Sequence, residues 1–312
     1  MTSVCRVFAI VSFSSGILLA EEKSSWEITE IDGGKYVAVE QIQKFYGFTQ
    51  ATRKESAITL ESNKIEMKLE IGSAESLLNG VKVIFSKPVA ELGDKAYISG
   101  ADLSGLLDPM LRPNYIAGAS DFRTVILDPA DGEFTLKIAN LTKAQLEAKG
   151  FNVVLTGDEN QDVTPEERLT LANAVHENAV FIGISFNSDP EAERGIQTSP
   201  VARGEEIIAS DPFGSASVAL STSIHGSLIR RLGKNTEDGG IKRGEPEVFS
   251  AIKHPAILVK AGSLTHPYES RLIANDSYQA AIATAIVDGL GKYRFAVRSN
   301  PPVKFEDAPD PE

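Results

Sequence analysis

Between residues 122 and 295, segments with the apolar pattern of buried strands alternate with segments that have the periodicity of amphipathic helices. Alternation of this kind predicts an α/β fold, with a mostly parallel sheet and helices on both faces. Residues 187–215, by contrast, are expected to be irregular. The predicted strands are 123–128, 151–157, 179–187 and 255–262, and the predicted helices are 133–150, 164–178, 215–233 and 278–295.

Residues 26–110 have a different pattern, which predicts a small, strand-rich α+β domain in front of the α/β part. In "KIEMKLEI" (64–71), apolar residues alternate strictly with other residues, as in a half-buried strand. Asn79-Gly80 lies between two β-rich runs and predicts a hairpin with a type I′ turn. A weak repeat relates 33–48 to 93–108, because each has a glycine turn, a short strand and an amphipathic helix.

This repeat resembles the domain family named after the N-terminal domain of copper amine oxidases. Members commonly sit beside catalytic domains in exported bacterial proteins, so the resemblance implies packing or wall attachment. The name does not imply copper here, because no histidine precedes His176. The predicted domains are a signal peptide at 1–20, this domain at 26–110, a linker at 111–121, the α/β domain at 122–295 and a disordered acidic tail at 296–312.

The first twenty residues have the three parts of a secretory signal. Arg6 provides the positive charge, residues 7–20 are apolar, and Ala20 ends the segment before an acidic run. We therefore expect an exported protein, periplasmic or extracellular, with no membrane span after signal cleavage; the alternative is a buried core helix. The only cysteine, Cys5, lies in this segment, so the mature chain has no thiol. The net charge of −12 argues against nucleic acid as a partner.

A series of segments in the α/β part resembles the zinc-dependent N-acetylmuramoyl-L-alanine amidases. That family cuts the lactyl-amide bond between MurNAc and the stem peptide of peptidoglycan, so the resemblance implies a bacterial cell-wall protein. In the family, His, Glu and His hold a zinc ion, and a separate Glu is the general base. The segments are, in order, "VILDP", "GFNVVLTGD", "ERLTLANAV", "FIGISFN", "RGIQT", "GGIKRGEPEVF", "HPAILVKAGSLTHPYESRLI" and "YQAAIATAIVDGLGKY".

The resemblance assigns the family's four functional positions to residues of this chain. The family's Asp-Pro-Gly-His-Gly-Gly matches residues 128–133, which puts Asp131 at the first His ligand. The loop that the family inserts next is absent, and Glu133 is the best match to the Glu ligand. Ser185 stands at the second His ligand and Lys260 at the general base. Only Glu133 keeps its residue type.

These replacements predict a loss of zinc chemistry. Aspartate and serine are poor substitutes for two imidazoles, and a protonated lysine cannot accept a proton unless it is strongly desolvated. We expect a catalytically inactive protein without a cofactor, which binds peptidoglycan or an envelope protein and acts in wall binding or in the regulation of wall hydrolysis. The alternatives are an active amidase with a divergent or relocated metal site and a purely structural envelope protein.

Lys260 is expected to replace the metal's charge. Without a divalent cation, Asp131 and Glu133 would repel each other, so we predict an ion pair of Lys260 with one of them, within about 4 Å. The alternative is a solvated lysine. The turn formed by Asp128, Asp131 and Glu133 could instead hold a hard cation such as Ca²⁺, although acidic turns are more often solvated.

The four histidines and a few aromatic residues are the remaining candidates. We expect His176 and His225 on helix faces, His254 just before a strand and His266 in the loop after it. All four are interpreted as solvated or edge histidines, with His266 and His225 the candidates for a relocated zinc site. The candidates for glycan contact are Phe186, Phe213 and Tyr268.

Overall fold

The computed structural model of the chain describes residues 26–130, 132–157, 163–189, 194–201, 212–243 and 247–298. It contains two sheets, one with four strands in the order β1-β2-β9-β8 and one with eleven in the order β11-β10-β12-β15-β13-β14-β7-β6-β5-β4-β3. The predicted signal peptide lies outside the described residues. Of the predicted tail only 296–298 are described, and Ala296 ends the last helix.

The C-terminal half contains all the predicted strands and helices. The second helix begins with the predicted N-terminal signals, because Thr164 and Glu167 form a capping box and Pro165 is the first helical residue. The elements are β10 (Thr124–Pro129), α4 (Glu133–Glu147), β11 (Asn152–Leu155), α5 (Pro165–Asn173), β12 (Ala179–Asn187), β13 (Ile196–Pro200), α6 (Gly214–Leu232), β14 (Asp238–Lys242), η3 (Glu247–Ala251), β15 (Ala256–Ser263), α7 (Pro267–Ile273) and α8 (Asp276–Ala296).

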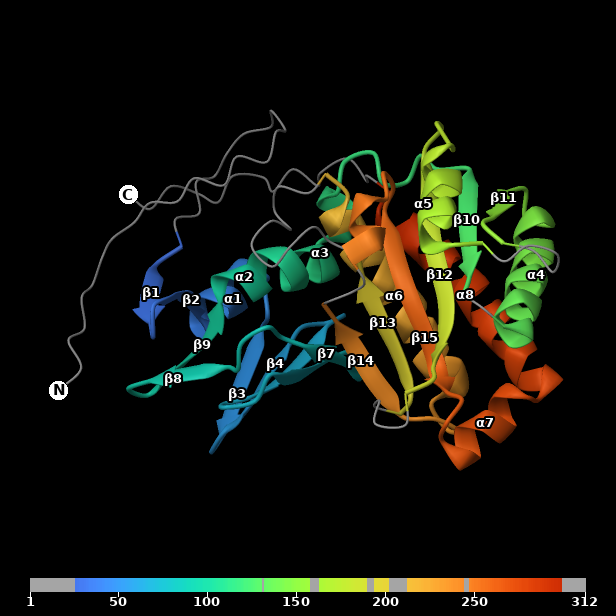
Figure 1. The fold of residues 1–312 in the computed structure, drawn as a ribbon. Coiled ribbons are helices and arrows are strands. Elements are labelled where there is room, and N and C mark those ends of the chain that lie inside the picture. The colour runs from blue at the N-terminus through green and yellow to red at the C-terminus, as the bar shows by residue number, and fades with distance from the viewer. Residues whose placement is uncertain are drawn as a thin grey trace.

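Helices cover both faces of this part of the sheet, as the alternation predicts (Figure 1). The helices α4, α6 and α8 pack on one face, where they share a large apolar core with β10, β12 and β15. On the opposite face, α5 and η3 cover a smaller core that includes Ile126, Phe181 and Leu258. Because successive side chains of a strand point to opposite faces, each central strand contributes to both cores.

Two predictions about these elements are wrong. The region expected to be irregular, 187–215, contains the strand β13. This strand runs antiparallel to β15, whereas β10–β11, β10–β12, β12–β15 and β13–β14 are parallel, so the eleven-stranded sheet is mixed. The helix α5 ends at Asn173, and His176 therefore lies after it rather than on its face.

In the N-terminal half, the strand and hairpin predictions are confirmed. Met67 and Leu69 are buried on one side of β5, and Asn79 and Gly80 both have positive φ, as a type I′ turn requires. The two repeats lie side by side, because β2 and β9 pair. The elements are β1 (Ile28–Ile31), β2 (Gly34–Ala38), α1 (Val39–Phe45), β3 (Gln50–Lys54), β4 (Ala57–Glu61), β5 (Glu66–Glu70), β6 (Glu75–Leu78), β7 (Val81–Ile84), β8 (Ala90–Leu92), β9 (Lys95–Ser99), α2 (Gly100–Asp102), η1 (Leu103–Leu107), α3 (Asp108–Leu111) and η2 (Pro113–Tyr115).

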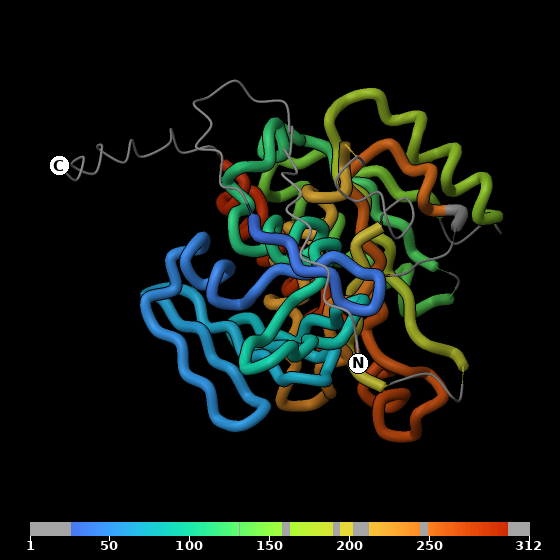
Figure 2. The backbone as a smooth tube through the Cα atoms, turned by 90° about the vertical axis from the view of Figure 1, so that its left-hand side faces the viewer, coloured from blue at the N-terminus to red at the C-terminus, as the bar shows by residue number. Residues whose placement is uncertain are grey.

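The two halves are joined by the sheet itself. The strand β7 of the N-terminal half pairs in parallel with β14 of the C-terminal half. Val218 of α6 and Ile241 of β14 belong to the apolar core of the N-terminal half. Figure 2 shows the N-terminal half, in blue and cyan, directly against the rest of the chain. The two predicted domains therefore share a continuous sheet and part of a core.

Candidate functional site

Three of the predicted site residues, Asp128, Ser185 and Lys260, belong to the parallel strands β10, β12 and β15, which lie side by side in Figure 1. Val259 and Ala261 of β15 point into the core beneath α4, α6 and α8. Lys260 lies between them and therefore points to the opposite face, which α5 covers. By the same alternation, Asp128 and Ser185 share this face with Lys260. Three of the predicted residues thus share one face near the carboxyl edge.

Ser185 and Lys260 are direct neighbours on adjacent strands. They are Cα partners in the β12–β15 ladder, and Gln197 of β13 is the partner of Lys260 on its other side. Ser185 and Lys260 are half-buried, whereas Gln197 is buried. The Ser185 hydroxyl donates a hydrogen bond to the Val259 carbonyl oxygen at 3.4 Å. The Lys260 side chain therefore has the Ser185 hydroxyl on one neighbouring strand and the Gln197 amide on the other.

Asp128 is the partner of Gly183 on β12, two residues before Ser185, and it belongs to a buried polar cluster. Its side chain is 2 % exposed and lies 3.2 Å from Nη1 of Arg168, which comes from α5. The Thr156 hydroxyl, just after β11, also donates a hydrogen bond to Asp128. Arg168 further donates to the carbonyl oxygens of Val163 and Pro129. Asp128 thus joins three elements and is already charge-paired.

Of the two remaining predicted ligands, the structure describes Glu133 but not Asp131. Glu133 is the first residue of α4, and its side chain is exposed. Among the described residues, Glu133 and Lys260 form no ion pair within 4.0 Å. Asp131 lies outside the described residues, so its predicted pair with Lys260 stays a prediction.

The interpretation of the histidines as solvated or edge residues is wrong for His225 and His254, which are buried. His225 bonds through Nδ1 to the Thr198 hydroxyl at 3.0 Å and through Nε2 to Asp238 at 2.9 Å. Burial lowers the pKa of His254. His266 lies in the loop after β15, as predicted, and its side chain caps the N-terminus of α7. The burial of His225 depends on Thr198, which is distant in sequence.

Glu269 is a buried residue of this edge that the sequence interpretation missed. Glu269 is 4 % exposed, and its carboxylate accepts hydrogen bonds from the backbone nitrogens of Gly195 and Ser263 and from the Thr236 hydroxyl. It therefore ties together the segments at the ends of β13, β14 and β15. A local signal was present, because His266-Pro267 followed by Glu269 matches the cap, proline and acid of α5.

The described part of the chain has neither a cluster of metal ligands nor a membrane-spanning helix. No three His, Cys, Asp or Glu side chains among those residues are grouped so that they could hold a metal ion. No helix there combines the length and the apolar character that crossing a membrane requires. Of the candidate aromatics, Phe186 and Phe213 are half-buried, and Tyr268 is 53 % exposed.

A family model described as N-acetylmuramoyl-L-alanine amidase matches residues 128–292, which is more than half of the chain. The protein therefore belongs to the N-acetylmuramoyl-L-alanine amidase family. Its curated relatives include the uncharacterized protein YqiI of Bacillus subtilis, which is 26% identical over 161 residues, or 52% of this chain and 73% of YqiI. The putative amidase YrvJ of the same organism is 24% identical over 246 residues, and the matched part is 73% of this chain but only 42% of YrvJ.

Solved structures of amidases are also similar to this chain. The N-acetylmuramoyl-L-alanine amidase of Clostridium difficile 630 has a TM-score of 0.48 and 25% identity, and the match covers 55% of this chain and 96% of that one. The CwlD amidase of Clostridioides difficile, solved in complex with the GerS lipoprotein, has a TM-score of 0.43 and 24% identity over 55% of this chain and 98% of that one.

Proposed function

We propose that the protein is an exported, amidase-fold component of the cell envelope that does not catalyse zinc-dependent hydrolysis. It acts in peptidoglycan binding or in the regulation of wall hydrolysis, either on peptidoglycan directly or through an envelope protein. The observation that carries the proposal is the pairing of Ser185 with Lys260 across β12 and β15. These are the positions matched to the second His ligand and the general base of the zinc-dependent amidases.

The described residues do not fit a zinc ion. Zinc in proteins takes imidazole, thiolate and carboxylate ligands, and the hydroxyl of Ser185 is a poor replacement for any of them. The ammonium of Lys260, on the adjacent strand, would repel a divalent cation. His225 does not substitute, because both of its ring nitrogens already have partners in the core. We therefore derive no catalytic step through a metal.

The proposed pair of Lys260 with Asp131 would keep this edge electrically balanced in the absence of a metal. Lys260 is half-buried, and neither neighbouring strand offers it a carboxylate at its own register, where Ser185 and Gln197 stand. Asp131 belongs to the matched ligand turn and follows the end of β10 by two residues in the sequence. This pairing is a proposal about the replaced site rather than an observed contact.

The N-terminal half has a proposed supporting role. As a domain of the family named after copper amine oxidases, residues 26–110 would serve packing or wall attachment rather than chemistry. The shared sheet through β7 and β14 supports this role, because it fixes the N-terminal half to the amidase fold. The proposed signal peptide at 1–20 would bring both halves to the envelope.

The proposal is tested by incubating the purified protein with peptidoglycan sacculi. Co-sedimentation measures binding, and newly exposed alanine amino groups measure cleavage of the lactyl-amide bond. We expect sedimentation without new amino groups, and weaker sedimentation of Tyr268→Ala if this exposed ring contacts the glycan. Chelator-sensitive release of amino groups would contradict the proposal and favour the alternative, an active amidase with a divergent metal site.

A further inference from the structure

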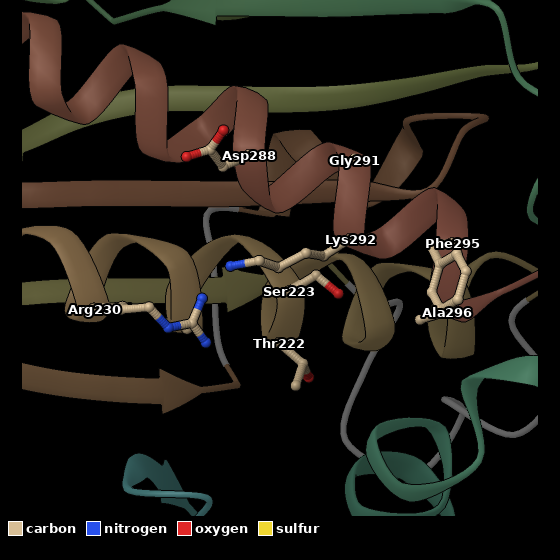
Figure 3. A pocket seen from close by; sticks show the side chains of 9 residues that line it. Thr222, Ser223, Arg230, Asp288, Gly291, Lys292, Phe295 and Ala296 are labelled. Carbon is tan, nitrogen blue, oxygen red and sulfur yellow. The ribbon is translucent and has the colours of Figure 1, made fainter.

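A groove lies on the helical face of the C-terminal half, between α6 and α8 (Figure 3). Its volume is about 540 Å³, within the range of small-ligand sites. The two helices touch closely nearby, because a Cβ on Gly289 would lie 2.6 Å from Cα of Ile224. Gly226 and Gly291 keep the groove open, since a Cβ on Gly291 would meet nothing within 4 Å and one on Gly226 only Val81.

Two cationic side chains occupy one end of the groove. In Figure 3, Lys292 extends from α8 toward α6, and the guanidinium group of Arg230 is turned toward the same space. Lys292 donates one hydrogen bond, to the Ser227 hydroxyl at 2.9 Å. Within the described part of the chain, Arg230 has no ion-pair partner. The one acidic residue of the groove, Asp288, is already paired with Arg231 at 2.9 Å.

The protein neutralises the positive charge of this end only in part, because Asp288 is the single carboxylate that lines the groove beside Arg230 and Lys292. Burial lowers the pKa of Lys292, and the charges of Arg230 and Arg231 lower it further, which outweighs the opposite effect of Asp288. A cationic groove on an acidic protein selects for an anionic group, because an anion would pair with both side chains at once.

The other end of the groove has an apolar surface with polar side chains near it. Phe295 is 78 % exposed, so its ring is available to a ligand. Thr222 and Ser223 add two hydroxyls on α6. An exposed ring and two hydroxyls in one groove suit a sugar, which has an apolar C–H face and a polar edge.

We propose that the groove between α6 and α8 binds a sugar that carries an acid group, either carboxylate or phosphate. Arg230 and Lys292 pair with the acid, and Phe295 packs against the sugar ring. This site is separate from the strand edge that carries Ser185 and Lys260, because it lies on the outer side of the helices that cover the opposite face of the sheet. The proposal therefore does not depend on the proposed function.

The test is a set of NMR titrations of the whole protein with glucuronate, glucose 6-phosphate, glucose, inorganic phosphate and adenosine monophosphate. We expect glucuronate or glucose 6-phosphate to bind more tightly than glucose and inorganic phosphate, and the tighter of the two acids identifies the preferred group. Arg230→Gln and Lys292→Gln should each weaken this binding by about three- to tenfold. Phe295→Ala should weaken the binding of the sugar acid but not that of inorganic phosphate.

Arg271→Gln is the matched control, because Arg271 is an exposed arginine on α7 outside the groove and its loss changes the net charge equally. The proposal is overturned if no sugar acid binds, or if Arg271→Gln weakens binding as much as Arg230→Gln. It is also overturned if inorganic phosphate binds as tightly as the preferred sugar acid. Tighter binding of adenosine monophosphate would assign the groove to nucleotides instead.

Discussion

At the scale of single residues, Asp238 links the two halves through the hydrogen bonds of its carboxylate. It accepts from the backbone nitrogens of Lys82 and Gly240 and bonds to His225. Burial acts to raise the pKa of Asp238, but these hydrogen bonds outweigh it, and the pKa lies below its ordinary value of 3.8. The ionised form therefore stabilises the folded state.

We predict that Asp238→Asn lowers the free energy of unfolding by about 2 kcal/mol at pH 7. Because the pKa of Asp238 is lower in the folded than in the unfolded state, this stabilisation is full above the unfolded pKa and is lost as the pH falls through the folded one. Urea unfolding at pH 7 and near pH 3 measures the difference, with the exposed Asp94→Asn as control. If Asp238→Asn lowers the free energy of unfolding equally at both pH values, the charge of Asp238 does not contribute to stability.

Single residues also show what a sequence can reveal about a site. The family pattern correctly locates Ser185 and Lys260 on strands, and their alternation with core residues is enough to predict which face they share. The burial of His225 was not predictable, because its partners Thr198 and Asp238 are provided by two strands that have weak signals of their own. The sequence of α6 alone does not distinguish a buried His225 from a histidine on the exposed face of the helix.

At the scale of elements, the contact between α6 and α8 depends on Gly289. A Cβ at this position would lie 2.6 Å from Cα of Ile224 and 3.0 Å from the Ser223 carbonyl oxygen. We predict that Gly289→Ala lowers the free energy of unfolding by about 2 kcal/mol or more, since backbone atoms must move. Thermal or urea unfolding measures the loss.

Gly291 on the same helix is the matched control for Gly289. A Cβ there would meet nothing within 4 Å, and alanine is favoured over glycine in a helix, so Gly291→Ala should stabilise by about 0.5–1 kcal/mol. If the two substitutions have the same effect, close packing of α6 on α8 is not what holds this face together.

Long periodic elements were predictable from the sequence, and short strands were not. The helices α4, α6 and α8 and the strand β12 have clear periodicity, and their predicted positions agree with the structure. The strand β13 reads "IQTSP", with polar residues that are buried only because β14 and β15 lie on either side of it. Its identity as a strand is set by those neighbours rather than by its own sequence.

At the scale of the whole molecule, the sheet makes one unit of two regions that look independent in the sequence. The β7–β14 pairing and the shared core around Ile241 would both be lost if the halves separated. The composition change near residue 110 predicts a domain boundary but contains no information on whether strands pair across it. That pairing depends on the edge strands that each half leaves open.

We predict that both halves unfold in one transition. Trp26, the single tryptophan, packs against Phe45 and reports on the N-terminal half, whereas far-UV circular dichroism reports mainly on α4, α6 and α8. The urea midpoints from fluorescence and from circular dichroism should coincide. Separate midpoints would show two independently stable domains, as the predicted boundaries alone would suggest.

The central claim is that this member of the amidase family has lost its zinc site, and the most direct measurement is the zinc content of the protein. Residues 21–312 are purified without chelator, dialysed against a zinc buffer and then against buffer alone, and analysed for bound metal. With Ser185 and Lys260 side by side on β12 and β15, we expect no retained zinc. About one tightly held zinc per chain would contradict the account and direct attention to His266 and the residues near it.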